Sequence, residues 1–134
     1  MSIILFKSNS AEHVMSRTLK AEQVGIFIAA VSALIWLSVP WWVYLLLLLG
    51  PDISMLGYLA GNKIGGALYN IFHLQGVGAV LVVIGLNPNY QNCLIAGLII
   101  IGHSSMDRIF GYGLKYLSGF KYTHLGEIGK NKID

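Results

Sequence analysis

The sequence predicts an all-α fold, a bundle of four transmembrane helices in a single integral membrane domain covering residues 1–134. Only 11% of the residues are charged, against about 25% in an ordinary soluble domain. No charged residue lies between Glu22 and Asp52 or between Lys63 and Asp107. A soluble domain of this size cannot hide two such stretches, because much of its residue count must face water. The composition therefore excludes a soluble enzyme, a disordered chain and a coiled coil.

The first uncharged stretch is too long for one crossing, because a transmembrane helix needs about 20 apolar residues. Proline breaks a helix, and tryptophan favours the lipid–water interface. Pro40, followed by two tryptophans, therefore predicts a turn at residues 38–40. We expect the first two spans at about residues 20–38 and 41–61.

The second uncharged stretch is interrupted at residues 87–92 by the polar sequence Asn-Pro-Asn-Tyr-Gln-Asn, which is a turn signal. We expect spans at about residues 65–86 and 93–114, followed by a cytoplasmic tail at 115–134. Ahead of the first span, residues 11–23 form either a short amphipathic helix on the inner membrane surface or a solvated extension of that span.

The charge distribution supports four crossings with both termini in the cytoplasm. Cytoplasmic segments of membrane proteins are rich in Lys and Arg, and the turns at 38–40 and 87–92 contain neither. A three-span arrangement would place the two basic ends on opposite sides. With four spans, every basic residue lies on one side: Lys7, Arg17, Lys20, Lys63, Arg108, Lys115, Lys121, Lys130 and Lys132. Topology and anionic lipid thus explain the net charge of +3, and we expect no nucleic-acid partner.

Several polar and ionisable residues fall inside the expected spans, where each ionisable group costs a few kcal/mol and usually marks function. They occur in three spans: Asp52 in the second, Asn70 and His73 in the third, and His103, Asp107 and Arg108 in the fourth. At 1.5 Å per residue, the Asp and His residues lie about 10 to 17 Å from the inner end of each helix. Because their depths agree, we expect these side chains to meet just inside the membrane midplane.

Two imidazoles and two carboxylates can bind a divalent transition metal such as zinc, manganese or iron. We predict Asp52, His73, His103 and Asp107 as the ligands. Asn70 would be a further ligand or would orient a bound water, so that Asp52 and Asn70 are the catalytic candidates. With an open position the metal would activate water, whereas with all four ligands engaged the site would be structural.

Two other interpretations of the same residues remain open. Asp and His side chains can pair with each other in a metal-free polar network that only satisfies helix packing. Haem is the second alternative, with His73 and His103 as axial ligands, although the nearby carboxylates argue against it.

The Gly50-Pro51 pair before Asp52 predicts a break in the second span. Pro51 lacks an N–H and would leave the carbonyl of Leu47 without its helical partner. Breaks of this kind occur in membranes where the backbone faces protein or a polar cavity. We expect a broken helix that presents Asp52 to the site, and a simple packing kink is the alternative. Gly57 and Gly61 form a GxxxG pattern that favours close approach of a neighbouring helix.

The residues after the fourth span interleave Tyr, Phe and Lys. One interpretation is an aromatic and basic belt that anchors the span at the inner interface. The other is a lid whose cations meet an anionic lipid headgroup close to the metal. The predicted headgroup-binding residues are Arg108, Lys115, Lys121 and His124.

Five short blocks together resemble a known family. They are Pro51–Tyr58, Tyr69–His73, His103 with Asp107 and Arg108, Gly111–Tyr116, and Thr123–Gly126. In combination they resemble the small bacterial membrane family catalogued as domain of unknown function 4260, over about residues 17–129. Ser104, Ser105 and Met106 depart from the more apolar residues of that family, but they are not predicted ligands. The resemblance implies a four-helix bacterial membrane protein and no established activity.

Three functional hypotheses follow from these residues. The leading one is an inner-membrane, metal-dependent hydrolase that acts on a lipid or lipid-linked substrate at the cytoplasmic side. The second is a non-enzymatic accessory subunit of a larger membrane complex, with a structural polar or metal site. The third is an ion or proton pathway, which the almost wholly apolar outer halves of the spans disfavour. Membrane lipid is the expected partner, together with a homo-oligomer or a larger membrane complex.

Overall fold

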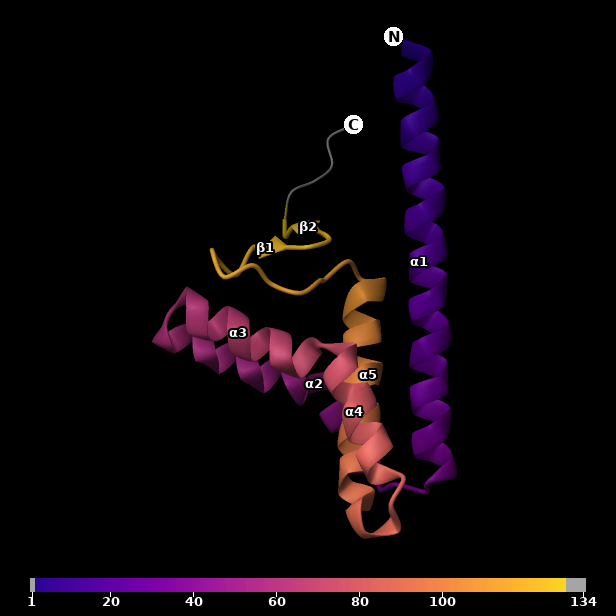
Figure 1. Cartoon of the computed structure of the whole chain (residues 1–134), viewed down its shortest axis with the longest axis vertical. Coiled ribbons are helices and arrows are strands. Elements are labelled where there is room, and N and C mark those ends of the chain that lie inside the picture. Colours follow the sequence, from indigo (N-terminus) through magenta and orange to yellow (C-terminus); the bar gives the residue numbers. More distant parts are fainter. Residues whose placement is uncertain (1, 130–134) are drawn as a thin grey trace.

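The computed structural model describes the backbone of residues 2–129 and the side chains of residues 9–129. The chain is mostly helical, as predicted (Figure 1). Its elements in order are α1 (Ser2–Trp36), α2 (Trp41–Leu49), the 3-10 helix η1 (Pro51–Ala60), α3 (Asn62–His73), α4 (Gln75–Gly85), η2 (Pro88–Tyr90), α5 (Gln91–Ile109), β1 (Tyr122–Thr123) and β2 (Gly126–Glu127). The end of the predicted cytoplasmic tail, residues 130–134, lies outside the described residues.

Helix α1 runs without a break from Ser2 to Trp36. The segment 11–23 is therefore continuous with the helix of the first span and is not a separate helix. The predicted turn at 38–40 is confirmed, since α1 ends at Trp36 and α2 begins at Trp41. Ser38 takes a φ of 53°, a left-handed conformation that reverses the chain within a few residues.

Two helical segments are long and apolar enough to cross a membrane, Asn9–Trp36 and Trp41–Ala60. A third candidate is the pair α3 and α4, which bend by 47° at the intervening residue Leu74. The prediction of a single span at about 65–86 missed this bend, because the segment contains no proline to indicate a break.

The predicted fourth span corresponds to α5, which is shorter than expected and is not among the membrane-crossing candidates in the described part of the chain. Its last two turns contain the polar residues of the site, among them His103, Ser105, Asp107 and Arg108. These residues lower the mean hydropathy of the helix. The structure thus supports two to three candidate spans on length and composition.

The helices form an upright group with a side arm instead of four straight parallel rods. In Figure 1, α1, α4 and α5 run side by side, whereas the hairpin of α2–η1 and α3 leans out to one side. The break at Gly50-Pro51 lies within this arm, and the bend at Leu74 returns the chain from the arm to the upright group. The arm meets the upright group at the level of the polar residues.

Two kinds of packing hold the helices together. A small core of Leu34, Val43, Leu47 and Leu98 joins α1, α2 and α5. Glycines bring helix pairs close: a Cβ on Gly65 would collide with Tyr58 of η1, and one on Gly78 would lie 2.9 Å from the carbonyl oxygen of Gly97. Small residues are the usual means of such close contact between membrane helices.

The predicted GxxxG pattern has two separate roles. A Cβ on Gly57 would lie 3.2 Å from the Cα of Gly65, so Gly57 is a contact between η1 and α3, as expected. A Cβ on Gly61 would meet nothing within 4 Å, and Gly61 instead takes a φ of 114° in the tight turn between the two helices. Its conformation, and not helix packing, requires glycine at this position.

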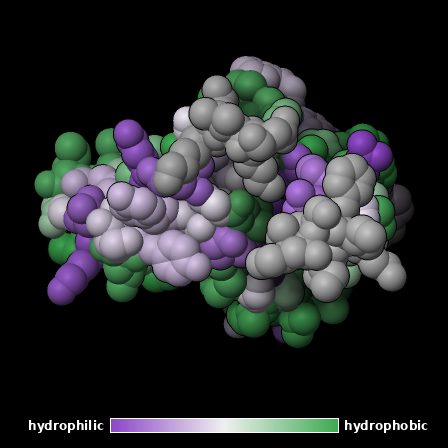
Figure 2. Space-filling view, turned by 90° about the horizontal axis from the view of Figure 1, so that it is seen from above, coloured by the Kyte–Doolittle hydropathy of each residue, from purple (hydrophilic) through white to green (hydrophobic). Residues whose placement is uncertain are grey.

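After α5 the chain folds into a compact cap. β1 and β2 form an antiparallel pair with Thr123 opposite Gly126, and Lys115 forms an isolated bridge with Thr123. The cap lies at the same end of the molecule as the N-terminal half of α1 (Figure 1). Viewed from that end, hydrophilic residues gather on the end face while hydrophobic residues form the rim (Figure 2).

Candidate metal centre

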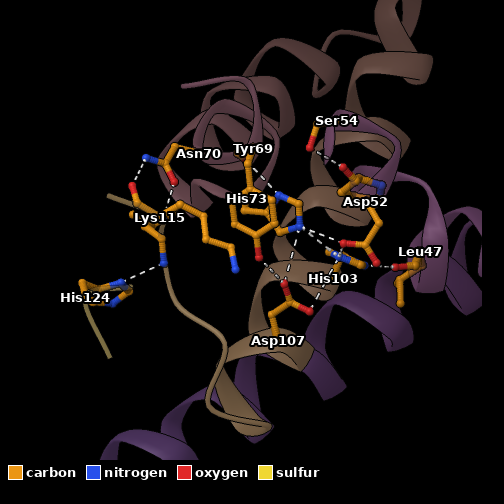
Figure 3. Close-up of polar contacts among 12 residues, drawn as sticks. Leu47, Asp52, Ser54, Tyr69, Asn70, His73, His103, Asp107, Lys115 and His124 are labelled. Carbon is orange, nitrogen blue, oxygen red and sulfur yellow. Dashed lines mark hydrogen bonds and ion pairs between the residues drawn. The ribbon is translucent and has the colours of Figure 1, made fainter. Parts of the chain in front are cut away.

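Four side chains from three elements converge where the arm meets the upright group (Figure 3). Asp52 comes from the first turn of η1, His73 from the end of α3, and His103 and Asp107 from α5. One ligand atom from each residue lies within 4.8 Å of the ligand atoms of the other three. The structure thus brings together all four predicted metal ligands, and the cluster could hold a metal ion.

The spacing within the cluster fits tetrahedral coordination. The two Nε2 atoms of His73 and His103 are 3.1 Å apart. Asp52 Oδ1 lies 3.4 Å from the His73 Nε2 and 3.3 Å from the His103 Nε2. The Asp107 oxygens lie 3.5 Å and 3.7 Å from the same nitrogens. Ligands about 2.0 to 2.1 Å from a tetrahedral zinc ion would be separated by about 3.3 Å.

The break at Pro51 orients His103. Because Pro51 has no N–H, the carbonyl of Leu47 lacks its helical donor, and the Nδ1 of His103 lies 2.8 Å from that oxygen. A carbonyl oxygen can only accept, so Nδ1 carries the proton and donates it. The lone pair of Nε2 therefore faces the cluster, which is the arrangement found for metal-binding histidines.

His73 is oriented in the same way by its own helix. Its Nδ1 donates to the carbonyl oxygen of Tyr69, one turn earlier, at 2.8 Å. The imidazole also stacks on the Tyr69 ring, with ring centroids 3.7 Å apart. The Nε2 lone pair of His73 thus points at the Nε2 lone pair of His103. Two lone pairs 3.1 Å apart repel each other unless a metal ion or a shared proton lies between them.

The two carboxylates differ in their surroundings. Asp107 is 15% exposed and accepts a hydrogen bond of 2.9 Å from the Tyr69 hydroxyl. Asp52 is 37% exposed, whereas the imidazoles of His73 and His103 are 3% and 0% exposed. The cluster is therefore enclosed by the histidines on one side and accessible beside Asp52 on the other.

The chain matches the family model described as Domain of unknown function (DUF4260) over residues 16–128, which contain all four cluster residues. The chain belongs to the DUF4260 family. No curated protein and no solved structure shows significant similarity to it.

The geometry of this DUF4260 member argues against the haem alternative. Axial ligands of a haem lie on opposite faces of the porphyrin, with the macrocycle between them. Here the Nε2 atoms of His73 and His103 are only 3.1 Å apart, and both carboxylates lie against them. No porphyrin fits between these groups, so His73 and His103 are not haem ligands in this arrangement.

A pocket of about 360 Å³ opens beside the cluster. It is lined by the carboxylates of Asp52 and Asp107. Residues of the cap also line it: Tyr112, Lys115, Phe120 and Ile128. The Lys115 side chain extends from the cap towards Tyr69 and Asp107 (Figure 3). Burial lowers the pKa of Lys115 below its ordinary value, while the charges of Asp107 and Asp52 act in the opposite direction.

Asn70 has a different role from the predicted one. Its Nδ2 donates to the Lys115 carbonyl oxygen at 2.8 Å, and its Oδ1 accepts from the Lys115 backbone N–H at 2.7 Å. Asn70 is also absent from the residues that line the pocket beside the cluster. It fastens the cap to α3 and is not placed to orient a water at the cluster.

The other predicted headgroup residues are separated from Lys115. Arg108 and His124 line a second groove, of about 710 Å³, between the cap and the N-terminal half of α1. The Nδ1 of His124 accepts a hydrogen bond from the backbone N–H of Leu114 at 2.8 Å. Lys121 is exposed and lines neither cavity. The four cations therefore do not form a single cluster.

One residue that supports the centre and one polar contact near it were not predicted from the sequence. Tyr69 holds Asp107 through its hydroxyl and His73 through its carbonyl and ring. Its position one turn before His73 is the only sequence signal for this role. A second polar contact joins α1, α4 and α5, where Gln75 donates to Gln23 and Ser105 at 2.7 Å and 2.9 Å. Gln23 and Gln75 are 52 residues apart in the sequence, so only the fold brings them together.

Proposed function

We propose that this DUF4260 member is a metal-dependent hydrolase of the bacterial inner membrane that acts on a lipid or lipid-linked substrate. The observation that carries the proposal is the pair of facing Nε2 lone pairs on His73 and His103, flanked by Asp52 and Asp107. Both histidines donate their other nitrogen to a backbone carbonyl, as metal-bound histidines do. Zinc suits this set of nitrogen and oxygen ligands best, with manganese or iron as alternatives.

The chemistry proposed for the centre is hydrolysis of an ester. A bound metal would lower the pKa of a coordinated water and polarise the ester oxygen. The water oxygen adds to the carbonyl carbon or phosphorus, the ester bond breaks, and the leaving oxygen takes a proton. His73, His103 and Asp107 would hold the metal and leave a fourth position for water. Asp52 is the exposed carboxylate of the cluster and faces the pocket, so it is the residue suited to accept the water proton.

The proposed topology has four crossings, with both termini in the cytoplasm. The cap and the N-terminal half of α1 lie at one end of the molecule, and they carry the basic residues Lys7, Arg17, Lys115 and Lys121. The turns at 38–40 and 87–92, without Lys or Arg, lie at the other end. This arrangement supports a pocket that opens towards the cytoplasmic side of the bilayer.

Metal analysis of the purified chain tests the metal site. We expect about one transition-metal ion per chain in the wild type and loss of that ion in His73→Ala and His103→Ala. The matched control is His13→Ala, because His13 is exposed on α1 and lies outside the cluster. If all four proteins hold equal metal, or if the wild type holds none, a shared proton would explain the close approach of the two Nε2 atoms.

Hydrolysis is tested separately with lipid esters of carboxylic and phosphoric acids in mixed micelles. The metal-loaded wild type should release product, and Asp52→Asn should lose at least about a hundredfold in kcat, as expected for a residue that takes the proton of water. A metal-loaded chain that hydrolyses none of these esters would favour the accessory-subunit hypothesis.

A further inference from the structure

Lys115 is an unusual residue for the edge of a membrane protein. Its side chain is only 4% exposed, although lysine is almost never fully buried unless it is paired. The Nζ atom lies 4.0 Å from the centroid of the Phe120 ring and 4.9 Å from that of Tyr69. None of the ion pairs among residues 9–129 includes Lys115, so aromatic faces stabilise the ammonium group in place of a carboxylate.

The backbone of Lys115 is held firmly in place. Asn70 bonds to both its N–H and its carbonyl oxygen, at 2.7 Å and 2.8 Å. On the other side, Lys115 is bridged to Thr123, and Tyr116 N–H donates to the Tyr122 carbonyl oxygen at 2.8 Å. These contacts fix where the side chain begins. A buried cation that is held in advance binds an anion without a large ordering cost.

The pocket in front of Lys115 is shared with the metal centre. Asp52 and Asp107 lie on one wall of the 360 Å³ space, and Lys115 lies on another. Met55, Phe120 and Ile128 supply apolar surface to the same pocket. A ligand in this space would therefore contact the metal, one cation and an apolar wall.

The net charge of the pocket favours one anionic ligand. Two carboxylates and two neutral imidazoles carry a charge of −2, and a divalent metal would bring the cluster to zero. Lys115 then leaves the pocket with one positive charge. A phosphate group has several acceptor oxygens and can contact a metal and an ammonium group together, as in phosphoryl-transfer enzymes.

We propose that Lys115 is the anion-binding residue of the metal pocket and that the ligand is a phosphate group. This inference rests on the proposed function and names its substrate class, a phosphate ester. The phosphate belongs either to a lipid headgroup or to a soluble molecule. The apolar wall of Met55, Phe120 and Ile128 favours the lipid.

Binding of inorganic phosphate to the metal-loaded full chain in detergent micelles tests the anion site. Calorimetry should give at least about tenfold weaker binding for Lys115→Met than for the wild type, because a charged hydrogen bond contributes about 1.5 to 3 kcal/mol. Lys115→Gln, which keeps a polar end without the charge, should give the same loss. Lys121→Met is the matched control, because Lys121 is exposed and outside the pocket, and it should bind as the wild type does.

Two further measurements distinguish an effect on the anion from an effect on the metal, and a lipid phosphate from a soluble one. Metal content should be unchanged in both Lys115 variants, since Lys115 is not a cluster residue. Micelles containing phosphatidic acid should compete with inorganic phosphate and those with phosphatidylcholine alone should not, if the phosphate is that of a lipid monoester. Absence of competition by either lipid assigns the pocket to a soluble phosphate.

Equal phosphate affinity in the wild type and both Lys115 variants would overturn the inference while leaving the metal site intact. Tighter binding of a fatty-acid carboxylate than of phosphate would overturn it as well. A wild-type chain that holds no metal would overturn both this inference and the proposed function.

Discussion

At the scale of single residues, the hydrogen bonds to Nδ1 decide what the histidines can do. Each imidazole donates from Nδ1 to a backbone carbonyl, of Leu47 for His103 and of Tyr69 for His73. Both Nε2 atoms are thereby left as lone-pair donors to a metal. The tautomer of His103 could not be inferred from the sequence, because the Leu47 carbonyl is 56 residues away from it.

Asn70 gives a prediction at the same scale. Replacing it in Asn70→Ala removes two hydrogen bonds to the Lys115 backbone and should loosen the cap by about 1 to 3 kcal/mol. Hydrogen exchange should show lost protection of the Lys115 amide. Asn92→Ala, at an exposed position at the start of α5, is the control and should leave that amide protected. Unchanged protection in Asn70→Ala would contradict the assigned role.

At the scale of elements, the proline break connects helix geometry to the site. η1 extends over Pro51–Ala60, whereas runs of 3-10 helix longer than three or four residues are uncommon. The break turns Asp52 towards the cluster and leaves the Leu47 carbonyl available to His103. Both consequences were expected in outline, since Pro51 stands beside Asp52. The sequence did not predict that His103 would donate the hydrogen bond to the Leu47 carbonyl.

Pro51→Ala tests this connection. The new N–H can bond to the Leu47 carbonyl and continue α2, so it competes with His103 for the same oxygen. We expect metal affinity to fall about 10- to 100-fold, the usual cost of losing a partner that orients a metal-bound histidine. Metal titration of purified protein measures the change. Pro88→Ala, in the distant turn η2, should leave the affinity as it is.

The contact between η1 and α3 gives a second prediction for elements. Gly65→Ala places a methyl group against the ring and backbone of Tyr58 and should destabilise the arm by about 1 to 3 kcal/mol. Gly25→Ala is the matched control, because nothing lies within 4 Å of that position, and it should be neutral or slightly stabilising. Thermal unfolding in detergent compares the two. A Gly65→Ala variant as stable as the wild type would show that the arm can shift to accept the methyl group.

At the scale of the whole molecule, the upright group and the side arm place one polar centre near one end of a mostly apolar body. Large apolar residues such as Trp36, Trp41, Leu59 and Leu86 are exposed, as expected for surfaces that face lipid. Hydrophilic residues gather on the end face instead (Figure 2). The molecule therefore has a polar end and an apolar flank, and the pocket lies between them.

The proposed topology is testable with single cysteines. In a Cys93→Ser background, Asn89→Cys should react with a membrane-impermeant maleimide in cells whose outer membrane is permeabilised. Lys121→Cys should react only after the inner membrane is opened, because the proposed topology places the cap in the cytoplasm. Both positions are exposed, so burial does not explain a difference between them. Equal labelling of the two would place both ends of the molecule on one side of the membrane.

Much of this protein is determined by sequence alone, for reasons of free energy. Long uncharged stretches require a membrane, and the polar turns at 38–40 and 87–92 divide them. Ionisable groups in apolar surroundings are too costly to stand alone, so the four cluster residues could be expected to meet.

The tertiary structure decided what local patterns do not encode. The bend at Leu74, the leaning arm, the tautomer of His103 and the pairing of Asn70 with Lys115 all depend on contacts between distant residues. Lys115 shows the difference most clearly. In the sequence it is one of several basic residues near a membrane edge, but packing buries it at the wall of the pocket that Asp52 and Asp107 also line.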